Sequence, residues 1–305
     1  MQRWLYRVRL LLGHGLSIPF HHLFNLFPEY EFGLSSVHVS RIICRHPPLA
    51  GRRAVHITDL HLDRYLPRHD HACHQIADLR PDWIFVTGDL LNVPDGVPHL
   101  FRFLSQLRGI APVYMTLGNH DHFSGVPPHQ FVELADRYKI VLLMNQTTLV
   151  PLGTGELAIV GLDDPTTHRA DVGCIPADSP DRYTVLLAHA PMVLDLLDES
   201  HAVHLTLCGH SHGGQWDIPG VRPFWLPPGC KGRLWGEYSK KGHRLYVNRG
   251  MGWTWLPIRI NCTPEILVID WVKDENDARA RTDVRECVQA PRGHDCAPFD
   301  PNPPS

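Results

Sequence analysis

The sequence predicts an α/β fold of the α+β type, in which two facing mixed β-sheets are flanked by helices in a four-layer αββα sandwich. Two observations predict it. Between residues 53 and 138, short apolar runs alternate with helical segments, which is typical of parallel strands joined by crossover helices. After residue 140, apolar runs follow one another across tight turns such as Gly153-Thr154-Gly155, which indicates hairpins and a second, partly antiparallel sheet.

The expected elements follow in chain order. Apolar runs of strand length that stop abruptly at a glycine or a polar residue indicate buried strands. The first half therefore has expected strands at 53–58, 83–87 and 112–117, with helices near 69–79, 99–108 and 129–138. The second half has expected strands at 140–143, 147–150, 157–160, 183–188, 203–207, 243–248 and 265–272, with one short helix at about 191–199.

The two ends of the chain differ from this central domain, which is expected over residues 53–272. Residues 1–28 form an amphipathic, membrane-proximal segment, with three arginines at its start and no charged residue from 10 to 27. Such a segment lies in the membrane interface or packs as a helix on the protein's own core, and the sequence leaves both open. Residues 29–52 are an irregular or extended lead-in, and residues 273–305 are expected to be a disordered tail.

Composition narrows the class of protein. The 305 residues carry a formal net charge of -3, so no broad basic surface indicates nucleic acid as a partner. The eight cysteines are scattered without a C-x-x-C pair, which favours reduced thiols in the cytoplasm over a secreted disulfide framework. We expect a cytoplasmic protein that associates peripherally with the inner face of the membrane; the sequence does not indicate an oligomeric state.

Polar side chains that can bind metal follow the expected strands directly. Carboxylate and amide oxygens are mixed with imidazole nitrogens, a combination that suits manganese, iron or zinc better than calcium or magnesium. In each D-x-H or H-x-H pair, residues two apart on an extended chain point to the same side. A carboxylate has two oxygens, so Asp89 can bridge two ions. The set is Asp59, His61, Asp89, Asn119, His120, His189, His210 and His212.

Five motifs in order resemble those of the calcineurin-like metallophosphoesterase superfamily: Asp59-Leu-His61, Gly88-Asp89, Gly118-Asn119-His120-Asp121, His189 and Gly209-His210-Ser-His212. The resemblance implies a hydrolase with two divalent ions, most simply manganese, with iron or zinc as alternatives. It implies that one ion is held by Asp59, His61 and His212, the other by Asn119, His189 and His210, and that Asp89 bridges them.

The same resemblance implies the chemistry. A metal-bridged hydroxide would attack a phosphodiester or pyrophosphate bond. His120 would contact the substrate phosphate and protonate the leaving oxygen, and Asp121 would orient His120. Asp163 and Asp164 also follow a strand, and we expect them in a loop or at the substrate rim. A metal-binding scaffold that has lost catalysis is an alternative of a different class.

Residues 216–255 form an expected insertion rich in tryptophan and basic residues. It is either a small aromatic core under a hairpin or a rim where aromatic side chains meet acyl chains and cations meet phosphate. On the second interpretation, the substrate-binding residues are Trp216, Lys231, Arg233 and Arg249.

Residues 246–266 and Gly213-Gly214-Gln215 resemble a bacterial membrane-associated branch that includes UDP-2,3-diacylglucosamine pyrophosphatases. That resemblance implies a phosphorylated, lipid-linked substrate and a role in lipid A biosynthesis. The alternative within the same class of enzyme is a general phosphodiesterase acting on nucleotides or phospholipids.

Overall fold

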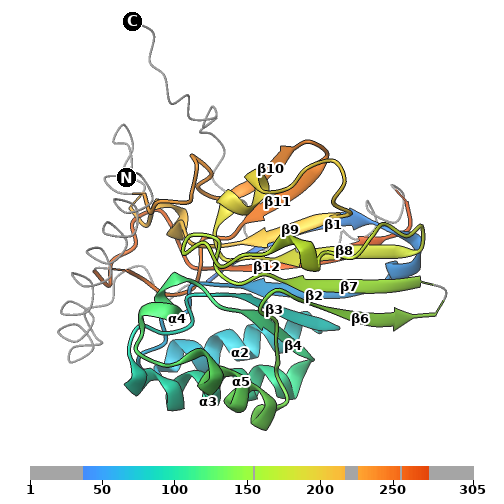
Figure 1. Ribbon diagram of the computed structural model, residues 1–305. Helices are drawn as coiled ribbons and strands as arrows, with labels where there is room; N and C mark the ends of the chain where they lie inside the picture. The colour runs from blue at the N-terminus through green and yellow to red at the C-terminus, as the bar shows by residue number, and fades with distance from the viewer. Residues whose placement is uncertain (1–36, 154, 217–225, 255, 275–305) are drawn as a thin grey trace, which may run out of the picture.

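A computed structural model describes residues 37–274 of the chain, except 154, 217–225 and 255. The predictions for residues 1–28 and for most of the tail therefore lie outside the described residues. Two six-stranded sheets lie face to face, and the α-helices gather on the outer face of one of them (Figure 1). This confirms the predicted fold class of two facing mixed sheets with flanking helices.

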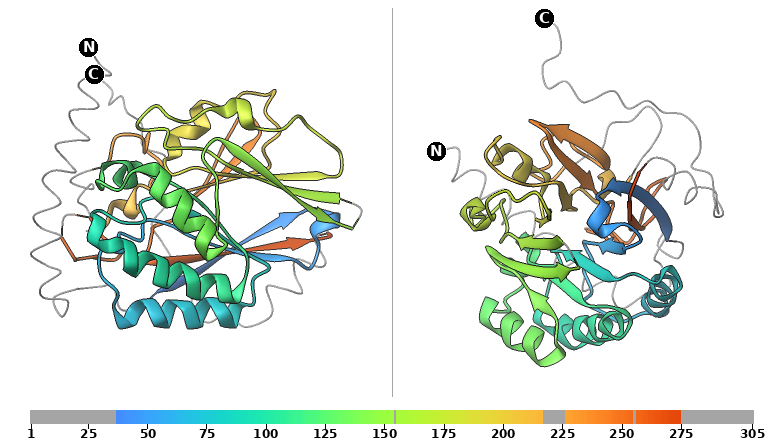
Figure 2. Two further views of the ribbon diagram at one scale, coloured as in Figure 1. Left: turned by 60° about the horizontal axis from the view of Figure 1, so that its bottom comes forward. Right: turned by 90° about the vertical axis from the view of Figure 1, so that its right-hand side faces the viewer.

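The first sheet has the strand order β1-β12-β2-β3-β4-β5. Its centre is parallel, with β2 (Arg53–Ile57), β3 (Trp83–Thr87), β4 (Val113–Thr116) and β5 (Val141–Leu142) running in one direction. The crossover helices are α2 (Pro67–Leu79), α3 (Val97–Ile110) and α5 (Pro128–Tyr138). All three cover the outer face of this sheet (Figure 2). A short helix α4 (Asn119–Phe123) follows β4 directly.

Two segments of the first sheet differ from expectation. Residues within the predicted lead-in form the edge strand β1 (His38–Arg45), which pairs in parallel with β12 (Glu265–Val272). Its inward side begins with polar His38 and Ser40, and its outward side mixes exposed Val39 with arginines, so the strand shows neither a continuous apolar run nor a regular apolar–polar alternation. The expected hairpin strand at 140–143 is instead β5, parallel to β4, because α5 returns the chain to the starting end of the sheet.

The second sheet has the order β10-β11-β9-β8-β7-β6. Strands β6 (Gln146–Leu152) and β7 (Gly155–Gly161) form the expected antiparallel hairpin. Strands β7, β8 (Arg182–Leu187), β9 (Leu205–Cys208) and β11 (His243–Val247) run parallel to one another. Strand β10 (Gly236–Lys240) pairs with β11 at the edge.

The buried side chains fall into three layers. Phe85 of β3 and Trp271 of β12 pack between the sheets, whereas the neighbours of Phe85 in β3, Ile84 and Val86, pack against the helices. This alternation explains why β3 is apolar throughout, since both of its faces are buried. In the described part of the chain, 3₁₀ helices and loops cover the outer face of the second sheet: the predicted helix at 191–199 is the 3₁₀ helix η5 (Pro191–Asp195), near η4 (Val172–Cys174).

Shorter 3₁₀ helices complete the described elements: η2 (Pro47–Leu49), η3 (Pro94–Gly96) and η6 (His212–Gly214). Over the described ranges, the model contains no helix that is both long and apolar enough to span a bilayer. The segment predicted to contact the membrane, residues 1–28, falls outside those ranges.

Candidate metal centre

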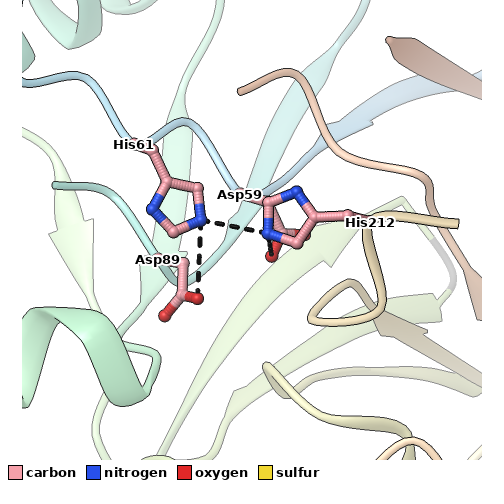
Figure 3. A group of neighbouring side chains, drawn as sticks. All are labelled: Asp59, His61, Asp89 and His212. Atoms are coloured by element: carbon pink, nitrogen blue, oxygen red, sulfur yellow. Dashed lines mark hydrogen bonds and ion pairs between the residues drawn. The ribbon is translucent and has the colours of Figure 1, made fainter. Parts of the chain in front are cut away.

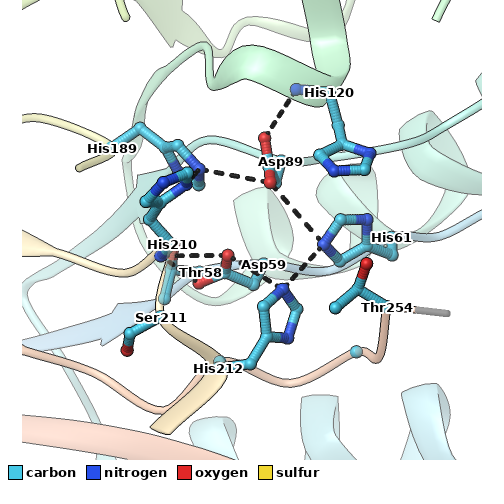
Figure 4. Close-up of polar contacts among 12 residues, drawn as sticks. Thr58, Asp59, His61, Asp89, His120, His189, His210, Ser211, His212 and Thr254 are labelled. Atoms are coloured by element: carbon cyan, nitrogen blue, oxygen red, sulfur yellow. Dashed lines mark hydrogen bonds and ion pairs between the residues drawn. The ribbon is translucent and has the colours of Figure 1, made fainter. Parts of the chain in front are cut away.

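The loops that follow the parallel strands of both sheets converge at one end of the sandwich. Strands β2 and β3 deliver Asp59, His61 and Asp89 from the first sheet, and β8 and β9 deliver His189 and His210 from the second. Figure 4 shows these side chains meeting around Asp89. Carboxyl ends of parallel strands are where α/β sheets place their ligand-binding loops, so the fold itself brings the motifs together.

The first cluster consists of Asp59, His61, Asp89 and His212, all buried, with their ligand atoms within 4.8 Å of one another (Figure 3). His61 Nε2 lies 3.1 Å from His212 Nε2 and 3.7 Å from Asp89 Oδ2. His212 Nε2 lies 3.4 Å from Asp59 Oδ1. Two carboxylates and two imidazoles at this spacing can surround one divalent ion.

The second cluster consists of Asp89, His189 and His210. Asp89 Oδ2 lies 3.1 Å from His189 Nε2, which lies 3.0 Å from His210 Nδ1. Asn119 is buried at the start of α4, and among the described residues nothing hydrogen-bonds its side-chain oxygen Oδ1. A buried, unpartnered amide oxygen needs a ligand. Asp89 belongs to both clusters, as the sequence predicted.

The hydrogen bonds behind the imidazoles aim their free nitrogens at the centre. His189 Nδ1 donates to the Thr87 carbonyl at 2.9 Å, and His210 Nε2 donates to the Pro228 carbonyl at 2.9 Å. Since a carbonyl can only accept, the protons of the neutral rings lie on these outer nitrogens. His189 Nε2 and His210 Nδ1 then face each other beside Asp89, where a cation can bind: a proton on His189 in the metal-free protein, or a divalent ion in its place. The side chains present therefore fit a pair of divalent ions.

Five of the seven predicted metal ligands have a left-handed backbone. Their φ angles are 49° at Asp59, 42° at His61, 49° at Asp89, 71° at His210 and 51° at His212. The expectation that the pairs Asp59/His61 and His210/His212 lie on extended chain is therefore wrong. The paired side chains converge because the chain turns tightly at each ligand, a conformation that costs about 1–2 kcal/mol per non-glycine residue.

Glycines allow the ligand loops to approach this closely. Gly88 has a φ of +79°, and a Cβ placed on it would lie 2.6 Å from the backbone nitrogen of Gly118. A Cβ on Gly250, which also has a positive φ, would lie 2.7 Å from the Cβ of Asp59. Side chains are excluded at both positions, so the backbone itself packs against the ligands.

His120 lies beside the first cluster, with its ring centroid 4.8 Å from that of His61. Its backbone N–H donates to Asp89 Oδ1 at 2.9 Å, and its Nδ1 donates to Asn92 Oδ1 at 2.7 Å. His61 Nδ1 donates to the same Asn92 oxygen at 2.9 Å. One amide oxygen thus holds both a metal-ligand imidazole and the predicted catalytic imidazole.

Asp121 has contacts different from those predicted. Its Oδ1 accepts hydrogen bonds from the backbone N–H groups of Leu90 and Leu91, and its Oδ2 accepts one from Gly118. These bonds fix the loop after β3 against α4. Asn92, whose Oδ1 accepts from His120 Nδ1, also orients the His120 ring, and the predicted action of Asp121 on His120 stays a prediction.

The buried charges shift one another's titration. Burial raises the pKa of Asp59 to about 7, and the Asp89 charge acts in the same direction. Burial opposes ionisation of Asp89 too, but the neighbouring His189 and His120 hold its pKa well below the usual range. Burial lowers the pKa of His189, but Asp89 outweighs burial and raises it to about 10. The centre therefore favours positive charge beside Asp89.

Arg259 is a buried residue of this centre that the sequence did not indicate. Its guanidinium donates to the carbonyl of Gly252 at 2.7 and 2.8 Å and to that of Arg249 at 2.9 Å. It also lies 3.4 Å from His212 Nδ1. The side chain thus ties the 249–262 segment to the first cluster. Arg259 lies 47 residues from His212 in sequence, so no local motif could have revealed the contact.

The four predicted substrate residues lie in different surroundings. Arg233 pairs with Asp195 of η5 at 2.8 Å, and the Trp216 indole donates to the Ile258 carbonyl at 2.8 Å. Lys231 is exposed. Arg249 lies over the ring of Trp235, with its guanidinium carbon 4.3 Å from the ring centroid. Arg249 lies close to the first cluster, because the next residue, Gly250, packs against the Cβ of Asp59.

Comparison with known proteins agrees with this geometry. The calcineurin-like phosphoesterase family model matches residues 52–214. The metallophosphoesterase YkuE of Bacillus subtilis (strain 168) is 32% identical over 72% of this chain and 78% of its own. The phosphodiesterase YaeI of Escherichia coli (strain K12) is 28% identical over 71% of this chain and 80% of its own. The chain belongs to the calcineurin-like metallophosphoesterase family and is a hydrolase acting on phosphoester bonds.

Proposed function

We propose that the protein hydrolyses a phosphodiester or pyrophosphate bond with two divalent ions, of which manganese is our first choice. The observation that carries the proposal is Asp89, whose carboxylate lies in both clusters. The similarity to a protein named as a phosphodiesterase supports a diester over a monoester.

The roles of the side chains follow from the site. Asp59, His61 and His212 would hold one ion, Asn119, His189 and His210 the other, and Asp89 both. Ions bound there would supply the positive charge that neutralises phosphate oxygens and activates water. His120 stands beside the first cluster, and its Nδ1 proton is committed to Asn92. Its Nε2 is therefore the atom that would bind the substrate phosphate and deliver a proton to the leaving oxygen.

A lipid-linked nucleotide, UDP-2,3-diacylglucosamine, is the specific substrate that we propose. Trp235 is 44% exposed although it is large and apolar. It stacks on Arg249 beside the first cluster, and such a pair combines an apolar surface with a cation for phosphate. Residues 1–28 would then hold the protein at the inner face of the membrane, close to such a substrate.

Assays of the manganese-loaded protein test the two levels of the proposal separately. Hydrolysis of bis-p-nitrophenyl phosphate tests the phosphodiesterase, with Asp89→Ala as the inactive, metal-deficient control. Release of UMP from UDP-2,3-diacylglucosamine in mixed micelles tests the substrate. Hydrolysis of the model diester without UMP release would reject the lipid substrate and favour a general phosphodiesterase. Absence of both would reject the proposal.

Membrane association is tested by co-sedimentation with vesicles containing anionic phospholipid. We expect the full chain to sediment with the vesicles and a chain lacking residues 1–28 to remain in the supernatant. Equal sedimentation of both would show that residues 1–28 do not act as the anchor.

A further inference from the structure

The two halves of the metal centre carry unequal negative charge. The first cluster contains two carboxylates, Asp59 and Asp89. The second contains only Asp89, which it shares, together with Asn119, His189 and His210, whose side chains carry no negative charge. A divalent ion in a buried site is costly unless nearby negative charge balances it. The second half therefore needs further negative charge from outside its ligand set.

Asp164 lies in the loop next to the second cluster. It follows β7, which pairs in parallel with β8, the strand that leads into His189. The pairing continues past the strand ends, because the Leu162 N–H donates to the Leu187 carbonyl at 2.9 Å. Three adjacent parallel strands thus deliver Asp164, His189 and His210 to the same edge of the second sheet.

The two oxygens of Asp164 are in different environments. Oδ2 accepts hydrogen bonds from the Thr166 hydroxyl at 2.6 Å and from the Thr167 N–H at 2.7 Å. Oδ1 is buried, and no group in the described part of the chain hydrogen-bonds it. The whole residue has 0% exposure. A carboxylate buried in this way, with one oxygen unpaired, needs a positively charged or hydrogen-bonding ligand.

The adjacent Asp163 is already committed to the structure. Its Oδ1 pairs with His122 Nε2 at 2.5 Å, which ties α4 to the loop after β7. Asp163 therefore fixes the helix that carries Asn119 and His120. This assignment leaves Asp164 as the carboxylate of the pair without a structural partner for Oδ1.

The charge of Asp164 acts on both imidazoles of the second cluster. Burial and the nearby His189 lower the pKa of His210 to about 4, whereas Asp89 and Asp164 act in the opposite direction. Asp164 also favours positive charge on His189, together with Asp89 and Asp59. Asp164 is not among the residues whose ligand atoms lie within 4.8 Å of one another, so its effect on an ion there would be exerted through space or through water.

We propose that Asp164 is a positioning residue that supplies negative charge to the second half of the centre and strengthens its hold on a divalent ion. The proposal concerns metal occupancy and rests on the metal-binding part of the proposed function, not on the identity of the phosphoester. Carboxylates placed behind a metal site typically change metal affinity by about 10- to 100-fold.

The test measures manganese binding to the metal-free full-length protein. Isothermal titration calorimetry gives the affinities, and electron paramagnetic resonance detects the signal of coupled manganese pairs. Asp164→Asn keeps the shape and removes the charge. Asp164→Ser is a second uncharged variant in case the first does not fold, and Asp164→Glu keeps the charge. Asp136→Asn, at an exposed carboxylate of α5, is the control for removal of a negative charge, and thermal unfolding confirms the fold of each variant.

We expect Asp164→Asn and Asp164→Ser to bind the first ion normally and the second about tenfold or more weakly, with loss of the coupled-pair signal at limiting manganese. Asp164→Glu and the control Asp136→Asn should keep both ions. Two ions bound at unchanged affinity by a folded, uncharged variant would overturn the proposal. An equal loss of affinity for the second ion in Asp164→Glu would also overturn it, because the shape of the side chain, and not its charge, would then determine binding. Neither readout depends on turnover, so failure of the substrate assignment would leave this result unaffected.

Discussion

Removal of the Asn92 side chain should weaken both metal binding and turnover. Its Oδ1 accepts from His61 and His120, and its Nδ2 donates to Asp63 Oδ2 at 2.8 Å. Asn92→Ala therefore deletes the hydrogen bonds to both imidazoles and the one to Asp63. At about 0.5–1.5 kcal/mol for each of these three bonds, we expect a loss of about 1.5–4.5 kcal/mol in unfolding free energy.

Three measurements check this prediction. Thermal unfolding of the metal-free protein should show a melting temperature lower by about 5–15 °C. Calorimetric titration should show manganese affinity about 10- to 100-fold weaker, because the His61 ring is no longer fixed. The kcat for bis-p-nitrophenyl phosphate at saturating manganese should fall about 100-fold, because His120 is no longer held.

A double-mutant cycle separates the two effects of Asn92. In a His120→Ala background, Asn92→Ala should still weaken metal binding but should cause little further loss of kcat at saturating manganese. Multiplicative losses of kcat in the double mutant would refute the idea that Asn92 acts through His120. Unchanged metal affinity in the single mutant would refute its action through His61.

Three further predictions concern the same centre. His120→Ala should lower kcat about 10²- to 10⁴-fold while metal analysis still finds two ions; near-normal turnover would remove its assigned role. Arg259→Met should lower the unfolding free energy by about 3 kcal/mol in chemical denaturation, because buried carbonyls lose their hydrogen-bond donor. Arg259→Lys keeps the charge but lacks the planar guanidinium, so it should restore stability only in part. Unchanged stability of the Met variant would contradict this prediction. The metal-free protein should melt lower as the pH rises from about 7 to 9, because Asp89 overcomes burial and raises the pKa of His189 to about 10, so the folded chain holds a proton that the unfolded chain has lost. Burial raises the pKa of Asp59 and of Asp121 to about 7, and these carboxyls act in the same direction mainly below pH 7. Differential scanning calorimetry with and without manganese checks the sign, since bound ions replace these protons; a metal-free melting temperature that increases with pH would contradict it.

The metal-ligand motifs could be read from the sequence because each lies in a short segment at the end of a strongly apolar strand. Contacts made within a loop were harder to read. Asn92 lies three residues after Asp89, and the Gly88-Asp89-x-x-Asn92 spacing was an available signal. The sequence does not show which groups Asp121 binds, because a carboxylate that accepts hydrogen bonds from backbone amides looks the same in sequence as one that binds an imidazole.

The fold shows the same division between local and long-range information. The parallel strands and their helices were found close to their observed bounds, since burial on both faces makes β3 continuously apolar. Strand β1 was missed because only one side of it is deeply buried, and its alternation of Val39 with polar His38 and Ser40 is a weaker signal. Its pairing with β12, more than two hundred residues later, depends on contacts that no local pattern encodes.

The left-handed backbone at five metal ligands sets stability and function in opposition. At these positions glycine, and asparagine to a lesser degree, would adopt the required φ angles at lower cost than histidine. Variants such as His212→Gly would lose a ligand yet could raise the melting temperature of the metal-free chain. Selection for thermal tolerance alone would then remove catalysis first at the positions that define the family. Histidine and aspartate bear this backbone cost at the five positions because their side chains supply the nitrogen and oxygen atoms that a metal ion can bind.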